Sequence, residues 1–277
     1  MDLITDFVAF VTAVAMSVAA PFVQPIDHEI AETFQVAPGS LVAIDLRGGS
    51  IKVMPADGRT ARIVLIERVT GASEAAAERA RAEAVVELVQ DGDVVRLRAR
   101  GPQGFRWFGG ARVQMRAEAW VPADVRLSLD TSGGSIRVDG HRTAAVEANT
   151  SGGSIRVGGG TAPIRVDTSG GSIHVGRVGD TLSADTSGGS ISVDHVEAGA
   201  RGVQLGTSGG SIRVGVSPAA RLAIEAGTSG GRVNVADLPL EVEHRSRTRI
   251  RGVLNGGTAP LRAETSGGSV TISAADE

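Results

Sequence analysis

Apolar and polar residues alternate along most of the chain beyond residue 121. On both sides of a recurring Thr-Ser-Gly-Gly motif, apolar residues occupy every second position, and polar or small residues lie between them. Leu127 and Leu129 precede the first motif, for example, and Ile136 and Val138 follow it. Alternation with period two predicts strands with one buried face. Each copy therefore predicts a strand, a Ser-Gly-Gly bend, a second strand and a return loop.

The motif recurs at regular spacing. Successive copies begin 19, 18, 18, 21, 21 and 37 residues apart, and the last interval is close to two ordinary ones. We therefore expect one degenerate copy near Leu240 to Ile250. An earlier relative, Leu-Arg-Gly-Gly-Ser-Ile, occupies residues 46–51. The seven copies begin at Thr131, Thr150, Thr168, Thr186, Thr207, Thr228 and Thr265.

Repeats of this length predict stacked strands. A unit of about 19 residues cannot bury an apolar face alone, so equivalent strands must stack on one another about 4.8 Å apart. The sequence thus predicts an all-β fold, a single-stranded β-solenoid of about eight coils of 18–21 residues. We expect the glycines to supply the positive φ angles of a sharp bend. These structural glycines are Gly133, Gly134, Gly152, Gly153, Gly170, Gly171, Gly188, Gly189, Gly209, Gly210, Gly230, Gly231, Gly267 and Gly268.

Residues 26–120 have a less regular pattern, typical of an α+β segment. Because the terminal units of a solenoid must be covered, we expect this segment to cap a repeat domain at residues 121–277. Nothing comparable follows the last copy, so we expect the C-terminal edge to be very short or covered by a partner. We predict strands at Ala61–Val69 and Arg112–Trp120, a helix over Glu74–Glu83 with Ser73 as N-cap, and a hairpin of Val85–Gln90 and Asp93–Ala99 closed by Asp91-Gly92.

Residues 1–25 contain an apolar run, Phe7–Ala20, that ends in small residues before Pro21. This pattern is typical of an export signal, and about fourteen apolar residues are few for a membrane span. However, Asp2 and Asp6 precede the run and no lysine or arginine occurs before Arg47, whereas an export signal normally begins with basic residues. The segment is therefore an export signal, a membrane-associated segment, or a buried or disordered one. We favour export to the cell envelope or surface.

The GGSI-type repeats, together with the upstream helix and the Asp91-Gly92 hairpin, resemble a bacterial family of β-helical domains of unknown function known as putative adhesins. The resemblance extends over roughly Ile26 to Ala274. It implies a right-handed, single-stranded β-helix in an envelope or surface protein. It implies no catalytic residues.

The composition argues against nucleic-acid binding and against a metal site. The chain has 277 residues and a net charge of -3, so it lacks the basic excess with which nucleic-acid-binding proteins neutralise phosphates. It contains no cysteine, and its five histidines show no paired spacing typical of metal ligands. We therefore expect no metal site, no cofactor and no nucleic-acid partner.

The residue before each Thr forms a mostly acidic row that includes Asp130, Asp167, Asp185 and Glu264. Neighbouring coils would bring Asp167 and Asp185 about 4.8 Å apart, within the range of paired glycosidase carboxylates. Acidic residues before a turn more commonly bond to backbone amides on a solvent-exposed face. We therefore predict no catalytic residue and keep this pair as an enzymatic alternative.

The outward residue between the two apolar positions after each bend forms a second row along the stack. Together with the acidic row, it is a candidate for a mixed-charge strip that binds an anionic glycan or polymer, but we favour the alternative of a solvated face on which neighbouring charges neutralise one another. Its candidate ligand-binding residues are Arg137, Arg156, His174 and Arg213.

Residues 101–110 form a glycine-bounded segment with three of the chain's eight aromatic residues. Aromatic and arginine side chains contribute strongly to binding, so the segment is a candidate contact loop for a partner or a membrane surface. We favour the alternative that its rings plug the first coil. The residues concerned are Phe105, Arg106, Trp107 and Phe108.

These observations favour a non-enzymatic envelope or surface protein, an adhesin or scaffold that binds a glycan or an envelope protein through its strand faces. One alternative is a structural protein that self-associates through its C-terminal coil. A second is a polysaccharide-active enzyme that uses Asp167 and Asp185. Membrane association through the N-terminal segment is compatible with each of them.

Overall fold

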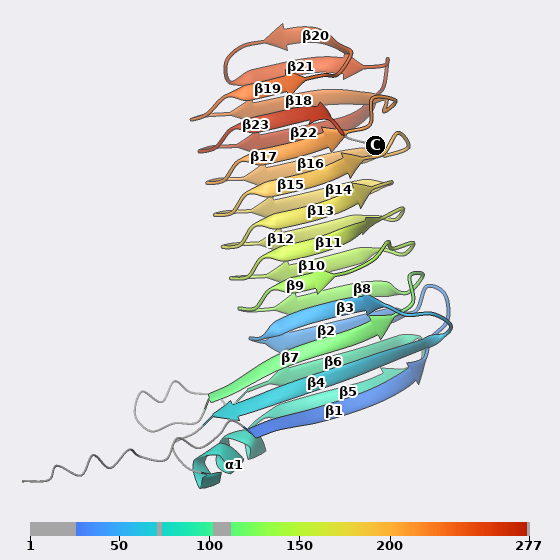
Figure 1. Cartoon of the computed structure of the whole chain (residues 1–277), viewed down its shortest axis with the longest axis vertical. Coiled ribbons are helices and arrows are strands. Elements are labelled where there is room, and N and C mark those ends of the chain that lie inside the picture. Colours follow the sequence, from blue (N-terminus) through green and yellow to red (C-terminus); the bar gives the residue numbers. More distant parts are fainter. Residues whose placement is uncertain (1–25, 71–73, 102–111, 276–277) are drawn as a thin grey trace, which may run out of the picture.

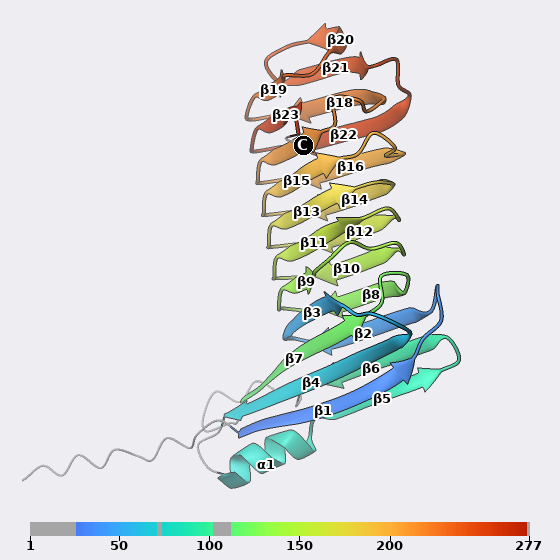
Figure 2. The same ribbon diagram turned by 45° about the vertical axis from the view of Figure 1, so that its right-hand side comes forward.

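The protein is a tall stack of strands arranged in two sheets that face each other (Figure 1). This computed structural model describes residues 26–70, 74–101 and 112–275. The buried side chains of the two sheets form a single apolar core. The Ser-Gly-Gly bends follow one edge of the stack, and the return loops follow the other (Figure 2). One helix, α1 (Glu74–Ala82), lies at the N-terminal end.

Sheet A contains the strands that follow the bends, and two antiparallel strands extend it at its N-terminal end. In spatial order it consists of β1 (Ile26–Gln35), β4 (Thr60–Thr70), β7 (Arg112–Val121), β3 (Ser50–Pro55), β9 (Ile136–Val138), β11 (Ile155–Gly160), β13 (Ile173–Val178), β15 (Ile191–Val196), β17 (Ile212–Val216), β23 (Val270–Ala274) and β19 (Val233–Ala236).

Sheet B contains the strands that precede the bends, with antiparallel strands at both ends. In spatial order it consists of β20 (Leu240–Arg245), β21 (Arg249–Leu254), β18 (Leu222–Thr228), β22 (Ala259–Thr265), β16 (Gly202–Thr207), β14 (Thr181–Thr186), β12 (Ile164–Thr168), β10 (Val146–Thr150), β8 (Arg126–Thr131), β2 (Leu41–Arg47), β6 (Val94–Arg100) and β5 (Val85–Asp91).

One strand of sheet B, one bend and one strand of sheet A make a rung of the stack. The predicted alternation is confirmed: Val146 and Ala148 are buried in β10 while Glu147 between them is exposed, and β11 repeats the pattern. The rungs pair in parallel and in register. The predicted β-solenoid fold is therefore confirmed. The eight copies of the motif form eight rungs, and β6 with β7 supplies a further one within the described residues.

The threonine of each motif points inward and joins its rung to the next. Thr168, for example, is buried, and its hydroxyl donates a 2.9 Å hydrogen bond to the carbonyl oxygen of Gly153 on the neighbouring rung. The equivalent bond occurs at Thr131, Thr150, Thr186, Thr207, Thr228 and Thr265.

The second glycine of each motif is required by close stacking. A side-chain carbon at Gly153 would lie closer than 3.0 Å to the carbonyl oxygen of Gly134, and the same collision recurs from rung to rung. The expectation that these glycines supply positive φ angles is wrong, because among the Gly-Gly pairs of the eight motif copies only Gly48 and Gly49, of the divergent early copy, have them. The first glycine of each motif is less constrained, because a side-chain carbon added at Gly152 would lie 3.5 Å from its nearest neighbouring atom.

The order of rungs differs from the order of the sequence at the C-terminal end. The last rung, β22 with β23, lies between β16/β17 and β18/β19. The expected degenerate copy near Leu240 to Ile250 is absent; these residues form the antiparallel hairpin of β20 and β21. The expectation that the last coil forms the C-terminal edge is wrong as well, because β19 and β20 end the two sheets.

At the N-terminal end, too, the order of the rungs differs from the order of the sequence. The rung of β2 and β3 lies between β6/β7 and β8/β9, so the link from β7 to β8 passes over it. The predicted strands, helix and hairpin of residues 26–120 are present, with bounds within a few residues of those expected. Antiparallel β1, β4 and β5 close this end of the stack.

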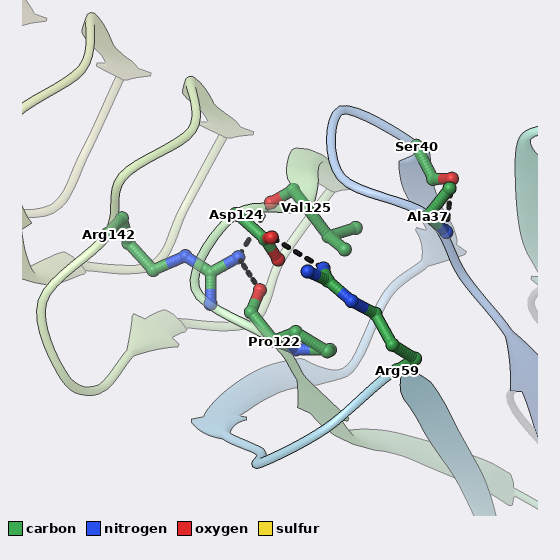
Figure 3. A network of polar contacts seen from close by, with 7 residues as sticks. All are labelled: Ala37, Ser40, Arg59, Pro122, Asp124, Val125 and Arg142. Carbon is green, nitrogen blue, oxygen red and sulfur yellow. Dashed lines mark hydrogen bonds and ion pairs between the residues drawn. The ribbon is translucent and has the colours of Figure 1, made fainter.

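Arg142 holds the link from β7 to β8 in place (Figure 3). Its guanidinium group is buried and donates hydrogen bonds of 3.0, 2.8 and 2.6 Å to the carbonyl oxygens of Val121, Pro122 and Val125. Burial lowers the pKa of Arg142 to about 10, against the opposing effect of Asp124. Asp124 itself pairs with Arg59 at 2.6 Å, which ties the link to the end of the β3–β4 loop.

Candidate binding groove on sheet B

A long groove of about 920 Å³ follows the ends of the sheet B strands, at the outer side of the bends. It crosses every rung from β6 to β18 because the same motif positions line it each time. An exposed serine hydroxyl from each copy of the full motif lines the groove. In spatial order these are Ser132, Ser151, Ser169, Ser187, Ser208, Ser266 and Ser229.

The acidic row lies beside the serines on the same face. Strand register places Asp45, Asp130, Asn149, Asp167, Asp185, Gly206, Glu264 and Gly227 next to one another in this order. Neighbouring members of such a row are about 4.8 Å apart.

Neighbouring groups partly neutralise the acidic row. The Asn149 side-chain amide donates a 2.9 Å hydrogen bond to Asp130, and Arg165 lies 3.2 Å from Asp167. Asp185 lacks such an ion pair among the described residues, and desolvation, followed by repulsion from Asp167, raises its pKa. Its carboxylate lies over Gly206 on the next rung, where a larger residue would collide with it.

Arginine residues line the groove at both of its ends. Arg47 and Arg100 are register partners at the N-terminal end, and Arg249 of β21 pairs with Gly227 at the other end. The groove therefore has a hydroxyl-rich and acidic middle with positive charge at each end.

The structure places the second predicted row on sheet A. Arg137, Arg156, His174 and Arg213 lie on successive positions of its outer face, with Lys52 before them and Ser192 between the last two. None of them lines the groove on sheet B. The two rows therefore do not form one mixed-charge strip, because they belong to opposite sheets.

Local partners also occupy part of this second row. Arg137 pairs with Asp139 at 2.6 Å, and His174 contacts Ser192 at 2.8 Å and Asp194 at 3.1 Å. Arg156 and Arg213 are exposed and make no ion pair with other described residues.

The two carboxylates of the enzymatic alternative are brought together as predicted, because Asp167 and Asp185 are register partners on β12 and β14. Both face the open groove. The serine row was not singled out from the sequence, although the signal was present: the residue after each Thr is always a serine.

The four candidate residues from Phe105 to Phe108 lie outside the described residues, as do the expected N-cap Ser73 and the segment of residues 1–25.

In the part of the chain that the structure describes, no three potential ligands gather into a metal site. No described helix has the length and apolar character needed to span a membrane.

The Toastrack DUF4097 family matches residues 124–273, more than half of the chain. The chain belongs to this family. The Toastrack region begins just before β8 and includes the seven full motifs, so it coincides with the regular part of the stack and its intercalated last rung. The resemblance seen in the sequence, to β-helical domains of unknown function known as putative adhesins, is thereby confirmed.

Several solved structures match this Toastrack chain at low identity. A putative adhesin from Bacteroides fragilis is 13% identical, with 89% of this chain and 96% of that chain covered and a TM-score of 0.45. A putative cell adhesion protein from Clostridium sporogenes is 8% identical, with 89% and 99% covered and a TM-score of 0.37. No curated protein matches the chain.

Proposed function

We propose that this protein is a non-enzymatic surface solenoid that binds an extended, hydroxyl-rich glycan chain in the groove on sheet B. The observation that supports the proposal is the repetition of one polar arrangement along the groove. Each of the seven rungs with the full motif adds an exposed serine hydroxyl, and most rungs add a carboxylate or amide beside it. A ligand with a repeating structure matches a site with a repeating structure.

The chemistry of the groove limits the kind of glycan. A serine hydroxyl both donates and accepts hydrogen bonds, and a carboxylate accepts them, so the groove complements sugar hydroxyl groups along a chain. Asp130, Asp167, Asp185 and Glu264 repel anionic polymers. We therefore expect a neutral or amino-substituted glycan.

Calorimetric titration with dextran as the neutral probe and glycol chitosan as the amino-substituted probe tests the proposal. Ser169→Arg inserts a long charged side chain into the middle of the groove at an exposed position, so folding should be retained and binding lost. Gln204→Arg is the matched control, because Gln204 is exposed on the same sheet but does not line the groove. The absence of binding by the unmodified protein, or equal binding by both variants, would count against the proposal.

The same glycans test the non-enzymatic character of the groove. We expect no change in the length of a bound polysaccharide on long incubation. Depolymerisation that disappears in Asp167→Asn and Asp185→Asn would instead establish the enzymatic alternative. A protein partner in place of the glycan would show as binding to an envelope protein that Ser169→Arg abolishes.

Export to the cell surface is part of the proposal. It is supported by the apolar run Phe7–Ala20 and its small-residue end. Cell fractionation with N-terminal sequencing of the mature chain is the test. An envelope-associated chain that begins near Pro21 supports export, and a cytosolic chain that begins at Met1 contradicts it.

A further inference from the structure

A second cavity lies near the N-terminal end of the stack, beside the bend that joins β2 to β3. Its volume is about 520 Å³, which is within the usual range of small-ligand pockets. Three arginines line it, Arg47, Arg68 and Arg116, but only one carboxylate, Asp27, is among its described lining residues. We call this cavity the arginine pocket. The groove on sheet B has the opposite balance, with five carboxylates and three arginines.

The bend beside the arginine pocket differs from the seven full motifs. Leu46 and Arg47 replace the threonine and the serine, and both glycines have positive φ angles. In most full motifs the amide of the second glycine donates to the threonine hydroxyl, as Gly153 does to Thr150 at 3.4 Å. Leu46 has no hydroxyl, and the Gly49 amide donates no hydrogen bond to another described residue. This bend therefore adds a cation and an unpaired backbone donor to the pocket lining.

Two antiparallel strands of sheet A bring the other arginines to the same pocket. Arg68 of β4 pairs with Gln114 of β7, and Arg116 lies two residues further along β7. Long side chains can meet across such a diagonal. Arg47 and Arg116 are exposed and make no ion pair with other described residues. Two of the three guanidinium groups are therefore available to a ligand.

Asp27 neutralises only part of the positive charge. Its carboxylate accepts hydrogen bonds of 2.9 and 3.0 Å from Arg68. These bonds, and then the charges of Arg68 and Arg116, lower the pKa of Asp27 against the opposing effect of desolvation. Three arginines against one carboxylate leave the lining with two positive charges in excess. A phosphate monoester has a matching charge of about -1.5 to -2 at pH 7.

We propose that the arginine pocket binds the phosphate group of a sugar phosphate. Guanidinium groups and backbone amides are the donors that phosphate oxygens prefer. The cavity is larger than a phosphate ion, and Ser50 and Gln114 offer hydrogen-bonding groups to sugar hydroxyls. No aromatic side chain is among the described residues that line it, so a nucleobase would have no ring on which to stack. A polyhydroxylated ligand fits this lining better than a nucleotide does.

Two sources supply such a group, a free sugar phosphate and the phosphorylated end of a longer glycan. Arg47 lines both the arginine pocket and the groove on sheet B, so the two cavities meet at this residue. A glycan in the groove would then end with its phosphate in the pocket. This second source rests on the proposed function, whereas the pocket itself does not.

Calorimetric titration of the full chain with glucose 6-phosphate tests the pocket, with glucose as the uncharged probe. We expect the phosphate ester to bind and glucose not to bind. Arg47→Gln and Arg116→Gln should each weaken binding at least about tenfold, because each removes charge-assisted hydrogen bonds. Arg156→Gln is the matched control, since Arg156 is exposed on sheet A, has no ion pair with other described residues and does not line the pocket. The absence of binding by the unmodified protein, or equal binding by all three variants, would overturn the proposal.

A gain of affinity provides a readout that misfolding cannot imitate. Asp27→Asn removes the negative charge from the pocket lining. We expect it to tighten binding of glucose 6-phosphate about threefold or more, because charges a few ångströms apart interact by this order even in water. Unchanged or weaker binding by the folded variant would contradict the charge match on which the proposal depends.

A dextran oligosaccharide with a terminal phosphate distinguishes the two sources. Binding at least about tenfold tighter than that of glucose 6-phosphate, with the gain lost in Ser169→Arg, would assign the phosphate to a chain in the groove, because the second contact is then intramolecular. Equal affinities would make the free sugar phosphate the ligand of the pocket. Loss of glycan binding alone would remove the proposed function of the groove, and loss of glucose 6-phosphate binding alone would remove the pocket.

Discussion

The hydroxyl group of Thr265 donates a 2.7 Å hydrogen bond to the carbonyl oxygen of Gly210, 55 residues away in sequence. At Thr168, the equivalent bond joins residues only 15 apart. Thr228 bonds to Gly268 rather than to a glycine of the rung that precedes it in sequence. The last rung is therefore an internal layer that holds β18 and β19 to the rest of the stack.

The glycine positions of one motif should differ sharply in their tolerance of alanine. A methyl group at Gly153 collides with the backbone of the next rung, whereas one at Gly152 has 3.5 Å to its nearest neighbour. We expect Gly153→Ala to lower the free energy of unfolding by about 3 kcal/mol or more, because the rungs must separate. Gly152→Ala should change it by less than about 1 kcal/mol. Urea denaturation measures both, and similar losses would show that the stack adjusts to the extra carbon.

Arg142 should be among the residues that contribute most to stability. Arg142→Met removes the donors of three hydrogen bonds to carbonyl oxygens of the β7–β8 link. The carbonyl oxygens of Val121 and Pro122 keep backbone hydrogen bonds of 3.3 and 3.2 Å, whereas that of Val125 loses its donor. Hydrogen bonds from a charged donor contribute roughly 1.5–3 kcal/mol each, so we expect a loss of about 3 kcal/mol or more in chemical denaturation. Arg156→Met is the matched control, because Arg156 is exposed without an ion pair, and it should lose less than about 0.5 kcal/mol. Equal losses would refute this role.

The solenoid, the inward threonines and the two outward rows could be predicted from the sequence because each follows from local alternation. Val146, Ala148, Ile155 and Val157 alternate with polar residues whatever the neighbouring rung is. Copies that share one pattern must then pair in register. Prediction of the groove needs one further inference from the sequence, namely that the exposed serine beside each inward threonine repeats on one surface.

The order of the rungs could not be predicted, because it depends on contacts between interchangeable strands. The intervals from Thr186 to Thr207 and from Thr207 to Thr228 are both 21 residues, yet only the second passes over another rung. Leu261 and Ala263 present almost the same inward pattern as Ile224 and Ala226. Local sequence therefore does not distinguish a neighbouring rung from one inserted later.

Asp185→Asn should stabilise the protein slightly at neutral pH. The pKa of Asp185 is raised in the folded state, mainly by desolvation and then by Asp167, so its ionised form is less favourable there than in the unfolded chain. A raised carboxyl pKa means that stability falls as pH rises through that pKa. We expect a gain of less than about 1 kcal/mol at pH 7, which shrinks as the pH falls and Asp185 becomes protonated. Thermal unfolding across this range measures the difference, and a gain that is independent of pH would contradict the assigned cause.

Removal of the last rung should loosen strands that precede it in sequence. Without residues 259–277, β18 and β19 lose the strands with which they pair in parallel, and β16 and β17 lose one neighbour. We expect amide hydrogen exchange at least about tenfold faster in β18 to β21, with β8 to β15 still protected, because each rung contacts only its neighbours.

A deletion at the true end of the stack is the matched control for that truncation. Replacing residues 239–255 with a flexible linker removes β20 and β21 but keeps the intercalated rung, so β22 and β23 should remain protected by β16 and β17. Continued protection of β18 and β19 after the C-terminal truncation would mean that they can close directly onto β16 and β17. The inserted rung would then be an addition to a complete stack. Loss of protection confined to β18 to β21 would instead make the final rung the layer on which the whole C-terminal end depends.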